Sequence, residues 1–198
     1  MGKIVIIDYG AGNTRSVLYA LQRLGVTATV SDVPEEIRAA ERVIFPGVGQ
    51  AASAMERLRA KGLDTLIPAL TQPVLGVCLG LQLMCRHTDE GDIEGMGIFD
   101  AGVHHFRSAA TDALRIPHIG WNSVENSGSR LLDEVPGGSY FYFVHSYYAE
   151  TAPQTTAVTE YGIPFSAVME QDNFFATQFH PEKSGKVGEK VLKNFLRV

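Results

Sequence analysis

Short, continuous apolar runs that end in glycine-containing turns dominate the first half of the chain. Residues 4–7, 43–45 and 74–77 form such runs, and each is followed by glycines and then by a helical pattern. A strand without polar alternation is buried on both faces, which is typical of a parallel sheet covered by helices. The alternation across residues 1–86 therefore predicts an α/β fold with an open, mostly parallel sheet and helices on both faces.

The predicted helices alternate with strands, and the second half of the chain changes to short alternating or aromatic runs. Helices are expected at 14–24, from 34 to about 40, at 50–61, briefly after Gly62, and from Ser184 onward, with a further strand at 26–30. The later runs cover 98–106, 117–124, 140–148, 155–159, 165–170 and 174–179, and most should be added antiparallel strands. Because no linker or repeat separates the halves, we predict a single domain spanning residues 1–198.

Composition excludes several classes of protein. The 198 residues carry 17 Lys and Arg against 22 Asp and Glu, a net charge of -5, with no basic cluster. This balance argues against a nucleic-acid-binding protein. The most apolar window, residues 74–85, contains Gln82 and two glycines and is too short to span a bilayer. We therefore expect neither nucleic acid nor a membrane as a partner.

The few cysteines and the N-terminal residues favour a cytoplasmic location. Cys78 and Cys85 fit neither a disulfide framework nor a zinc motif, and no apolar signal-peptide core follows Met1. His104 and His105 are adjacent, so in a strand they point to opposite faces and cannot bind one ion together. No metal and no cofactor are predicted.

The turn at residues 10–12 invites a nucleotide-binding interpretation. Gly10-Ala11-Gly12 follows a strand, but Arg15 takes the place of the third glycine of a dinucleotide-binding turn. We interpret the segment as a tight turn at the same edge of the sheet.

The sequence Gly76-Val77-Cys78-Leu79-Gly80 predicts a nucleophile elbow. An apolar strand leads into it and a helical pattern follows, so the cysteine lies at a strained strand-to-helix corner where flanking glycines remove Cβ atoms. The start of the helix favours a thiolate, and the Leu79 amide points where an oxyanion forms. The simpler alternative is a small buried cysteine, which is the better interpretation for Cys85.

A cysteine nucleophile needs a base and a group that orients the base. His180 follows the predicted strand 174–179, at the carboxyl edge where sites of parallel sheets assemble. In an extended segment Glu182 lies on the same side as His180, which predicts a Cys-His-Glu triad. Separately, a His-x-Glu pair is more often a surface feature. The turn Pro46-Gly47-Val48-Gly49 also ends a strand at this edge, so one of its amides is a candidate second oxyanion donor, or the turn is a plain connection.

These motifs resemble the class I glutamine amidotransferases. The motifs that carry the resemblance are GVCLGLQ at the elbow, PGVG at 46–49 and HPE at 180–182. DYGAGN at 8–13, IGWN at 119–122, YFVHSYYA at 142–149 and FHPEKSG at 179–185 resemble the branch that forms the glutaminase subunits of imidazole glycerol phosphate synthases in histidine biosynthesis. The resemblance covers essentially the whole chain.

The resemblance implies a role for individual residues. It implies Cys78 as nucleophile, His180 as general base and acid, Glu182 as the orienting group, and oxyanion amides from Val48 and Leu79. It further implies that glutamine is held by Gly49, Gln82, Glu90, Ser146 and Tyr147, and that Asn13, Trp121 and Lys183 lie near the synthase interface. Without the resemblance, these would be ordinary helix, loop, strand or core residues.

The resemblance also implies the reaction. Glutamine is hydrolysed through a γ-glutamyl thioester to glutamate and ammonia, and the ammonia passes to a separate (β/α)8-barrel subunit, which makes imidazole glycerol phosphate and AICAR. Such a barrel takes about 250 residues and cannot be part of this chain, so a heterodimer is expected. The open alternatives are a glutaminase serving another synthase, a γ-glutamyl hydrolase, and a non-catalytic binding module.

Overall fold

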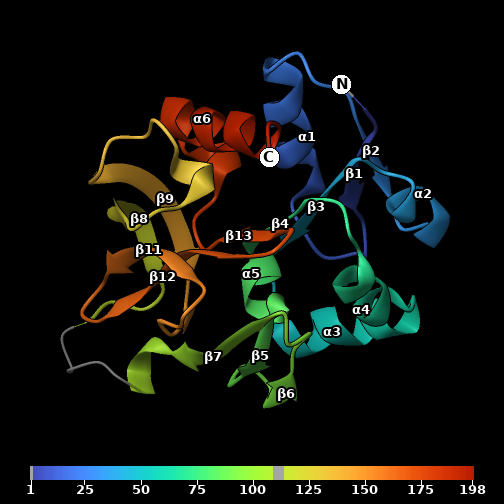
Figure 1. The fold of residues 1–198 in the computed structure, drawn as a ribbon. Helices are drawn as coiled ribbons and strands as arrows, with labels where there is room; N and C mark the ends of the chain where they lie inside the picture. The colour runs from blue at the N-terminus through green and yellow to red at the C-terminus, as the bar shows by residue number, and fades with distance from the viewer. Residues whose placement is uncertain (1, 109–113) are drawn as a thin grey trace.

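A nine-stranded sheet forms the centre of the fold, and its two halves differ in strand direction (Figure 1). The computed structural model describes residues 2–108 and 114–198. The parallel half contains, in spatial order, β2 (Ala28–Ser31), β1 (Ile4–Ile7), β3 (Arg42–Gly47), β4 (Val74–Cys78) and β13 (Phe174–Thr177). The antiparallel half continues with β12 (Pro164–Gln171), β11 (Thr155–Glu160), β8 (His118–Asn126) and β9 (Ser139–His145). The predicted parallel sheet with added antiparallel strands is confirmed.

A second, four-stranded sheet lies beside the first and was not predicted. Its order is β10 (Tyr147–Ala149), β7 (Phe99–His105), β5 (Cys85–Thr88) and β6 (Ile93–Glu94). The prediction of one strand over 140–148 is wrong, because the chain bends at Ser146 and passes from β9 in the large sheet to β10 in the small one. This bend brings Ser146 and Tyr147 to a junction between the two sheets.

Helices cover both faces of the parallel half (Figure 1). Helices α1 (Thr14–Arg23) and α6 (Gly185–Phe195) share one core cluster with the sheet, whereas α2 (Pro34–Arg38), α3 (Ala51–Ala60), α4 (Leu63–Leu66) and α5 (Leu79–Met84) share the other. Short 3-10 turns are η1 (Ile67–Ala69), η2 (Phe106–Ser108), η3 (Arg130–Leu132) and η4 (Pro181–Lys183). None of the helices in the described residues is long and apolar enough to cross a membrane.

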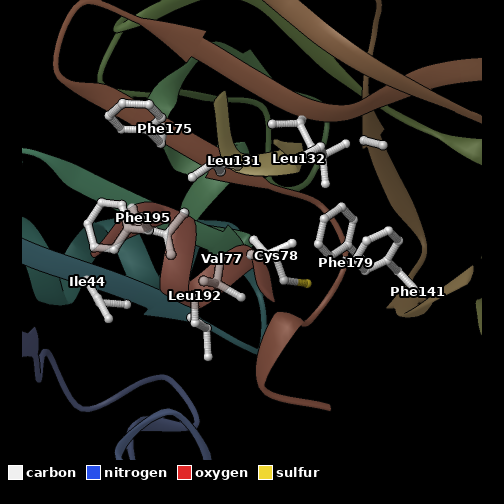
Figure 2. Close-up of a cluster of buried hydrophobic side chains, with 14 of the residues drawn as sticks. Ile44, Val77, Cys78, Leu131, Leu132, Phe141, Phe175, Phe179, Leu192 and Phe195 are labelled. Atoms are coloured by element: carbon white, nitrogen blue, oxygen red, sulfur yellow. The ribbon is translucent and has the colours of Figure 1, made fainter. Parts of the chain in front are cut away.

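Aromatic and aliphatic side chains fill the space between the sheet and α6 (Figure 2). Leu192 and Phe195 of α6 are buried in this cluster, and Phe141 of β9 stacks on Phe179 with ring centroids 4.1 Å apart. Burying each large side chain contributes about 1.5–3 kcal/mol. Cys78 belongs to the same cluster, so the core fixes the position of the turn that carries it.

The turns after the parallel strands meet at one edge of the sheet. The turn after β1 lies against the end of β3, since a Cβ atom on Gly12 would come within 3.0 Å of the Pro46 carbonyl oxygen. Gly12 also has a φ of +136°, a value that side chains other than hydrogen rarely permit. The glycine-rich segment is thus a tight turn at this edge, as predicted.

Candidate active site

The turn between β4 and α5 holds Cys78 in a strained backbone conformation. Its φ of 55° and ψ of -106° lie outside the usual regions for a residue with a side chain. Such strain persists only where the surrounding structure enforces it, and it is concentrated at functional sites. The elbow predicted from the glycine spacing is therefore present in the backbone.

Two glycines allow this elbow to pack closely. A Cβ atom on Gly80 would lie 2.2 Å from the Phe45 carbonyl oxygen of β3, and one on Gly76 would lie 2.9 Å from the Met84 sulfur. A backbone oxygen cannot move away as the end of a flexible side chain can. Gly80 is therefore required for α5 to approach β3, and the steric reason inferred from the sequence is correct.

His180 and Glu182 form a buried pair beside the elbow. His180 Nδ1 lies 2.8 Å from Glu182 Oε1, and both side chains are 1% exposed. The extended geometry predicted for residues 180–182 is wrong, because strand β13 ends at Thr177 and Pro181 begins the 3-10 turn η4. The turn still directs Glu182 toward the imidazole. Contact with the carboxylate places the proton on Nδ1 and leaves Nε2 free for a different partner.

The charge state of His180 is coupled to that of Cys78. Burial alone lowers the pKa of the imidazole, but the charge of the Cys78 sulfur, together with the hydrogen bond to Glu182, raises this pKa to about 10. His180 Nε2 is buried and has no hydrogen-bond partner in the described part of the chain. The arrangement sets an imidazole of raised pKa beside the Cys78 sulfur, and the thiolate is the nucleophilic form of a cysteine in such a pair.

A pocket of about 380 Å³ opens over Cys78. The pocket is lined by nearly all of the residues predicted to act on or hold the substrate: Val48, Gly49, Cys78, Leu79, Gln82, Glu90, Ser146, Tyr147 and His180. Glu182 lies behind His180 and does not line it. A larger cavity of about 550 Å³, near Arg130 and Arg197, contains none of the predicted residues and no nucleophile–base pair.

Three of the pocket residues already hold local structure in place. Glu90 accepts a hydrogen bond from the Ala51 amide at the start of α3, with Oε2 2.7 Å from the nitrogen, and burial raises the pKa of its carboxyl group. Gln82 is 4% exposed and donates to the Tyr147 carbonyl oxygen at 2.8 Å. Burial and the nearby charges of Glu90 and Asp89 raise the pKa of the Tyr147 phenol.

The second turn at the pocket mouth follows β3. Gly47 pairs with Cys78 in the sheet, so the Val48 backbone lies next to the elbow. Val48 is exposed, and Gly49 has a φ of +103° and no atom within 4 Å of the position that a Cβ atom would take. A backbone of this kind can rotate at little steric cost.

The residues expected near a partner lie outside the pocket. Trp121 is 54% exposed on β8 and packs edge-on to Tyr142, and the Lys183 ammonium lies 5.9 Å from the centre of the same Tyr142 ring. Asn13 caps α1 by accepting a hydrogen bond from the Ser16 amide at 3.2 Å. Trp121 is therefore a surface residue, which leaves it available to a partner.

Comparison with known protein families finds one family model that matches nearly the whole chain. The model of the family described as glutamine amidotransferase class-I matches residues 5–198. The chain belongs to the class I glutamine amidotransferase family. The imidazole glycerol phosphate synthase subunit HisH of Bacteroides thetaiotaomicron is 50% identical over 194 residues, covering 98% of each chain. The protein of the same name from Escherichia coli K12 is 45% identical over 198 residues, covering 98% of this chain and 99% of that one.

Solved structures support the same fold at low sequence identity. A glutamine amidotransferase crystal structure superposes with a TM-score of 0.74 at 19% identity, covering 98% of this chain and 97% of that chain. The structure of PurLQS from Thermotoga maritima gives a TM-score of 0.73 at 15% identity, covering 100% and 99%. These likenesses establish that this amidotransferase chain has the class I fold.

Two buried histidines support the floor of the amidotransferase pocket. His145 Nδ1 lies 2.7 Å from the Tyr147 carbonyl oxygen, and His145 Nε2 lies 3.0 Å from His118 Nδ1. Asn122 Nδ2 lies 3.3 Å from His118 Nε2. Since a carbonyl only accepts, His145 carries its proton on Nδ1, and His118 must then donate from its own Nδ1. Burial lowers the pKa of His118 to about 4 and that of His145 to about 3, so both are neutral at pH 7.

Some residues of the site were not predicted from the sequence. His145, Val144 and Pro117 line the pocket, and Gln178 contacts the Cys78 sulfur, with Nε2 3.6 Å from Sγ. Gln178 lies two residues before His180 at the end of a strand, a spacing that places side chains on one side and was a usable signal. His104 and His105 point apart, the first toward Asp89 at 3.1 Å and the second toward the Tyr147 ring.

We expect Gly80→Ala to destabilise the protein by about 3 kcal/mol, because the added methyl group collides with the Phe45 carbonyl of β3. Helix propensity alone predicts the opposite sign, a gain of about 1 kcal/mol. Urea denaturation measures the difference. Gly137→Ala is the control, since its Cβ atom meets only the Glu125 carboxylate at 3.6 Å. Equal stabilities of the two variants would contradict the steric account.

The neutral histidine pair predicts a loss of stability in acid. Both histidines have a lower pKa in the folded protein than in the unfolded chain, so the unfolded chain binds more protons as the pH falls below about 6.5. Between pH 6.5 and 5 this costs about 2 kcal/mol for each histidine. The double variant His118→Gln, His145→Gln should show a smaller difference in unfolding free energy between these pH values. An unchanged difference would mean that the pair does not titrate on unfolding.

Proposed function

We propose that this chain is the glutaminase subunit of an imidazole glycerol phosphate synthase and acts in histidine biosynthesis. Its relatives of that name match over nearly their full length at 45–50% identity, and the family model covers residues 5–198. The observation that carries the proposal is the pocket in which Cys78 and His180 face the same space, with Glu182 behind the imidazole. A single domain over residues 1–198 and a cytoplasmic location remain predictions from the sequence.

Cys78 is the proposed nucleophile, His180 the general base and acid, and Glu182 the orienting group. The Cys78 thiolate attacks the side-chain amide carbon of glutamine, and the imidazolium of His180 gives its proton to the departing ammonia. The resulting γ-glutamyl thioester is hydrolysed by a water molecule that His180, now neutral, deprotonates. Glu182 keeps the imidazole in the tautomer that presents Nε2 to the sulfur and the substrate.

The two backbone amides proposed for the oxyanion come from two turns next to Cys78. The Leu79 amide begins α5 directly after Cys78, and the Val48 turn follows the strand residue that pairs with Cys78. Preorganised donors of this kind stabilise the charge that develops on the amide oxygen. Since Gly49 permits rotation of the turn, the Val48 amide is the adjustable member of the pair.

Glutamine is proposed to bind in the pocket of about 380 Å³, with Gly49, Gln82, Glu90, Ser146 and Tyr147 around it. The free α-amino group of glutamine is a cation, and the Glu90 carboxylate supplies a negative charge at the wall. The side-chain oxygen of Gln82 and the backbone at Ser146 offer hydrogen bonds of the kind that fix orientation in small-molecule sites.

The proposed partner is a (β/α)8-barrel synthase subunit that forms a heterodimer with this chain. The surface around Trp121 and Tyr142 supports the proposal, because Trp and Tyr are enriched among the residues that contribute most to binding at interfaces. Asn13 caps α1 beside the turn at residues 10–12, at the same edge of the sheet as the pocket. Ammonia released at Cys78 would then enter the partner without meeting bulk water, where it would be protonated.

We expect Cys78→Ala to abolish glutamine hydrolysis while the complex still makes product from added ammonium salt, because the thiolate acts only in forming ammonia. The measurement compares glutamine-dependent and ammonium-dependent synthesis after co-purification with the barrel subunit. Cys85→Ala is the matched control, since Cys85 is buried away from the pocket, and it should retain glutamine-dependent synthesis. Glutaminase activity in the purified Cys78→Ala protein would overturn the proposed function.

We expect His180→Ala to reduce turnover about 10²-fold more than Glu182→Gln does. Loss of the histidine removes the base, whereas loss of the carboxylate leaves a base that is poorly oriented. Steady-state kcat with glutamine in the complex measures both. Equal or reversed losses would contradict the roles assigned to the two residues.

A further inference from the structure

The side chain of Gln178 contacts the sulfur of Cys78, although Gln178 is not one of the residues that line the pocket. Gln178 is completely buried after the end of β13, and its Nε2 lies 3.6 Å from Sγ, within hydrogen-bond range for sulfur. It is absent from the residues that line the pocket. The Gln178–Cys78 contact is therefore not among the contacts that form the pocket wall.

The direction of this contact follows from its neighbours. The Tyr147 carbonyl oxygen can only accept, so the Gln82 atom that faces it at 2.8 Å is Nε2. The same Nε2 also faces Gln178 at 3.1 Å, and the group there must accept, so it is Oε1. The other end of the Gln178 amide, its NH₂ group, is then the end that meets the sulfur.

The rest of the network holds this orientation. The Tyr147 carbonyl accepts from His145 as well as from Gln82, at 2.7 Å and 2.8 Å, so both of its lone pairs are used. His145 is held in turn by His118. Reversing the Gln178 amide would place Oε1 against the sulfur and set NH₂ groups of Gln82 and Gln178 against each other, which leaves buried donors unsatisfied.

We propose that Gln178 is a further catalytic residue, whose side-chain amide donates a hydrogen bond to the Cys78 sulfur and stabilises the thiolate. The inference rests on the proposed function, in which Cys78 is the nucleophile. A hydrogen bond to an ionised acceptor is about twice as strong as one between neutral groups. Once the thioester forms, the sulfur carries no charge and the bond weakens, so the donor acts on the free thiolate.

A purely structural role for Gln178 is the competing account. In that account the amide only supports Gln82, and its loss lowers stability or substrate affinity without changing the ionisation of Cys78. The two accounts differ in one measurable quantity, the pH at which Cys78 becomes reactive.

The test is the rate of iodoacetamide alkylation of the full chain from about pH 5 to pH 10, with Cys78 and Cys85 separated by mass spectrometry. The variants are Gln178→Met, which removes the donor at similar size, and Gln178→Glu, which places an acceptor there. Thr177→Val is the matched control: Thr177 is equally buried at the end of β13, next to Gln178, and its hydroxyl donates to the Phe179 carbonyl, not to the sulfur. We expect the alkylation midpoint to rise by about one to two pH units in both variants, with the high-pH rate retained, and to stay unchanged in the control.

Glutaminase turnover in the complex with the synthase subunit supplies the second measurement. At a pH below the alkylation midpoint of the wild type, we expect Gln178→Met to lower kcat about 10-fold or more with little change in KM. The kcat of this variant should recover as the pH rises. Unchanged midpoints, a loss of alkylation without a midpoint shift, or a shift without loss of kcat would each overturn the proposal. Should Gln178→Glu fail to fold, Gln178→Met decides alone. Activity retained by Cys78→Ala would instead refute the proposed function, so the two failures are distinguishable.

Discussion

The close approach of α5 to β3 is the constraint on which the rest of the site depends. A Cβ atom on Gly80 would collide with the Phe45 carbonyl oxygen at 2.2 Å. A Cβ atom on Gly47 would lie 2.7 Å from the Leu79 Cβ atom, which is also too close. Strand β4 passes directly into α5, so the chain turns at Cys78, which has a positive φ. The strain at Cys78 is the consequence of close packing that the two glycines permit.

Much of the fold could be predicted from the sequence because the signals were local. Continuous apolar runs identified β1, β3 and β4, and the glycines around Cys78 identified the elbow, since both patterns follow from burial and sterics within a few residues. The small sheet was missed because its strands are short and depend on partners far along the chain. Cys85 in β5 pairs with Phe99 in β7, and nothing in the sequence near Cys85 indicates that contact.

The candidate site could be predicted in part for the same reason. The parallel strands bring their following turns to one edge, so Val48, Cys78 and His180 line one pocket although they come from distant segments. The hydrogen bonds that join such residues to one another could not be predicted in this way. Gln82 and Gln178 are 96 residues apart, and their amide contact exists only because β4 and β13 are neighbours in the sheet.

The hydrogen bonds that join Asn122, His118 and His145 hold these side chains in place but cannot relay protons. A relay needs two proton arrangements of similar energy, whereas this network ends at the backbone carbonyls of Glu160 and Tyr147, which only accept. Asn122 donates to the Glu160 carbonyl oxygen and to His118 Nε2, so the proton of His118 lies on Nδ1. That Nδ1 donates to His145 Nε2, so the proton of His145 also lies on Nδ1, where it meets the Tyr147 carbonyl. Moving any proton would set two donors or two acceptors against each other in a buried site, at a cost of about 1–3 kcal/mol for each unsatisfied group. The polar groups beneath the pocket therefore keep one orientation, and that orientation presents an N–H group to the sulfur.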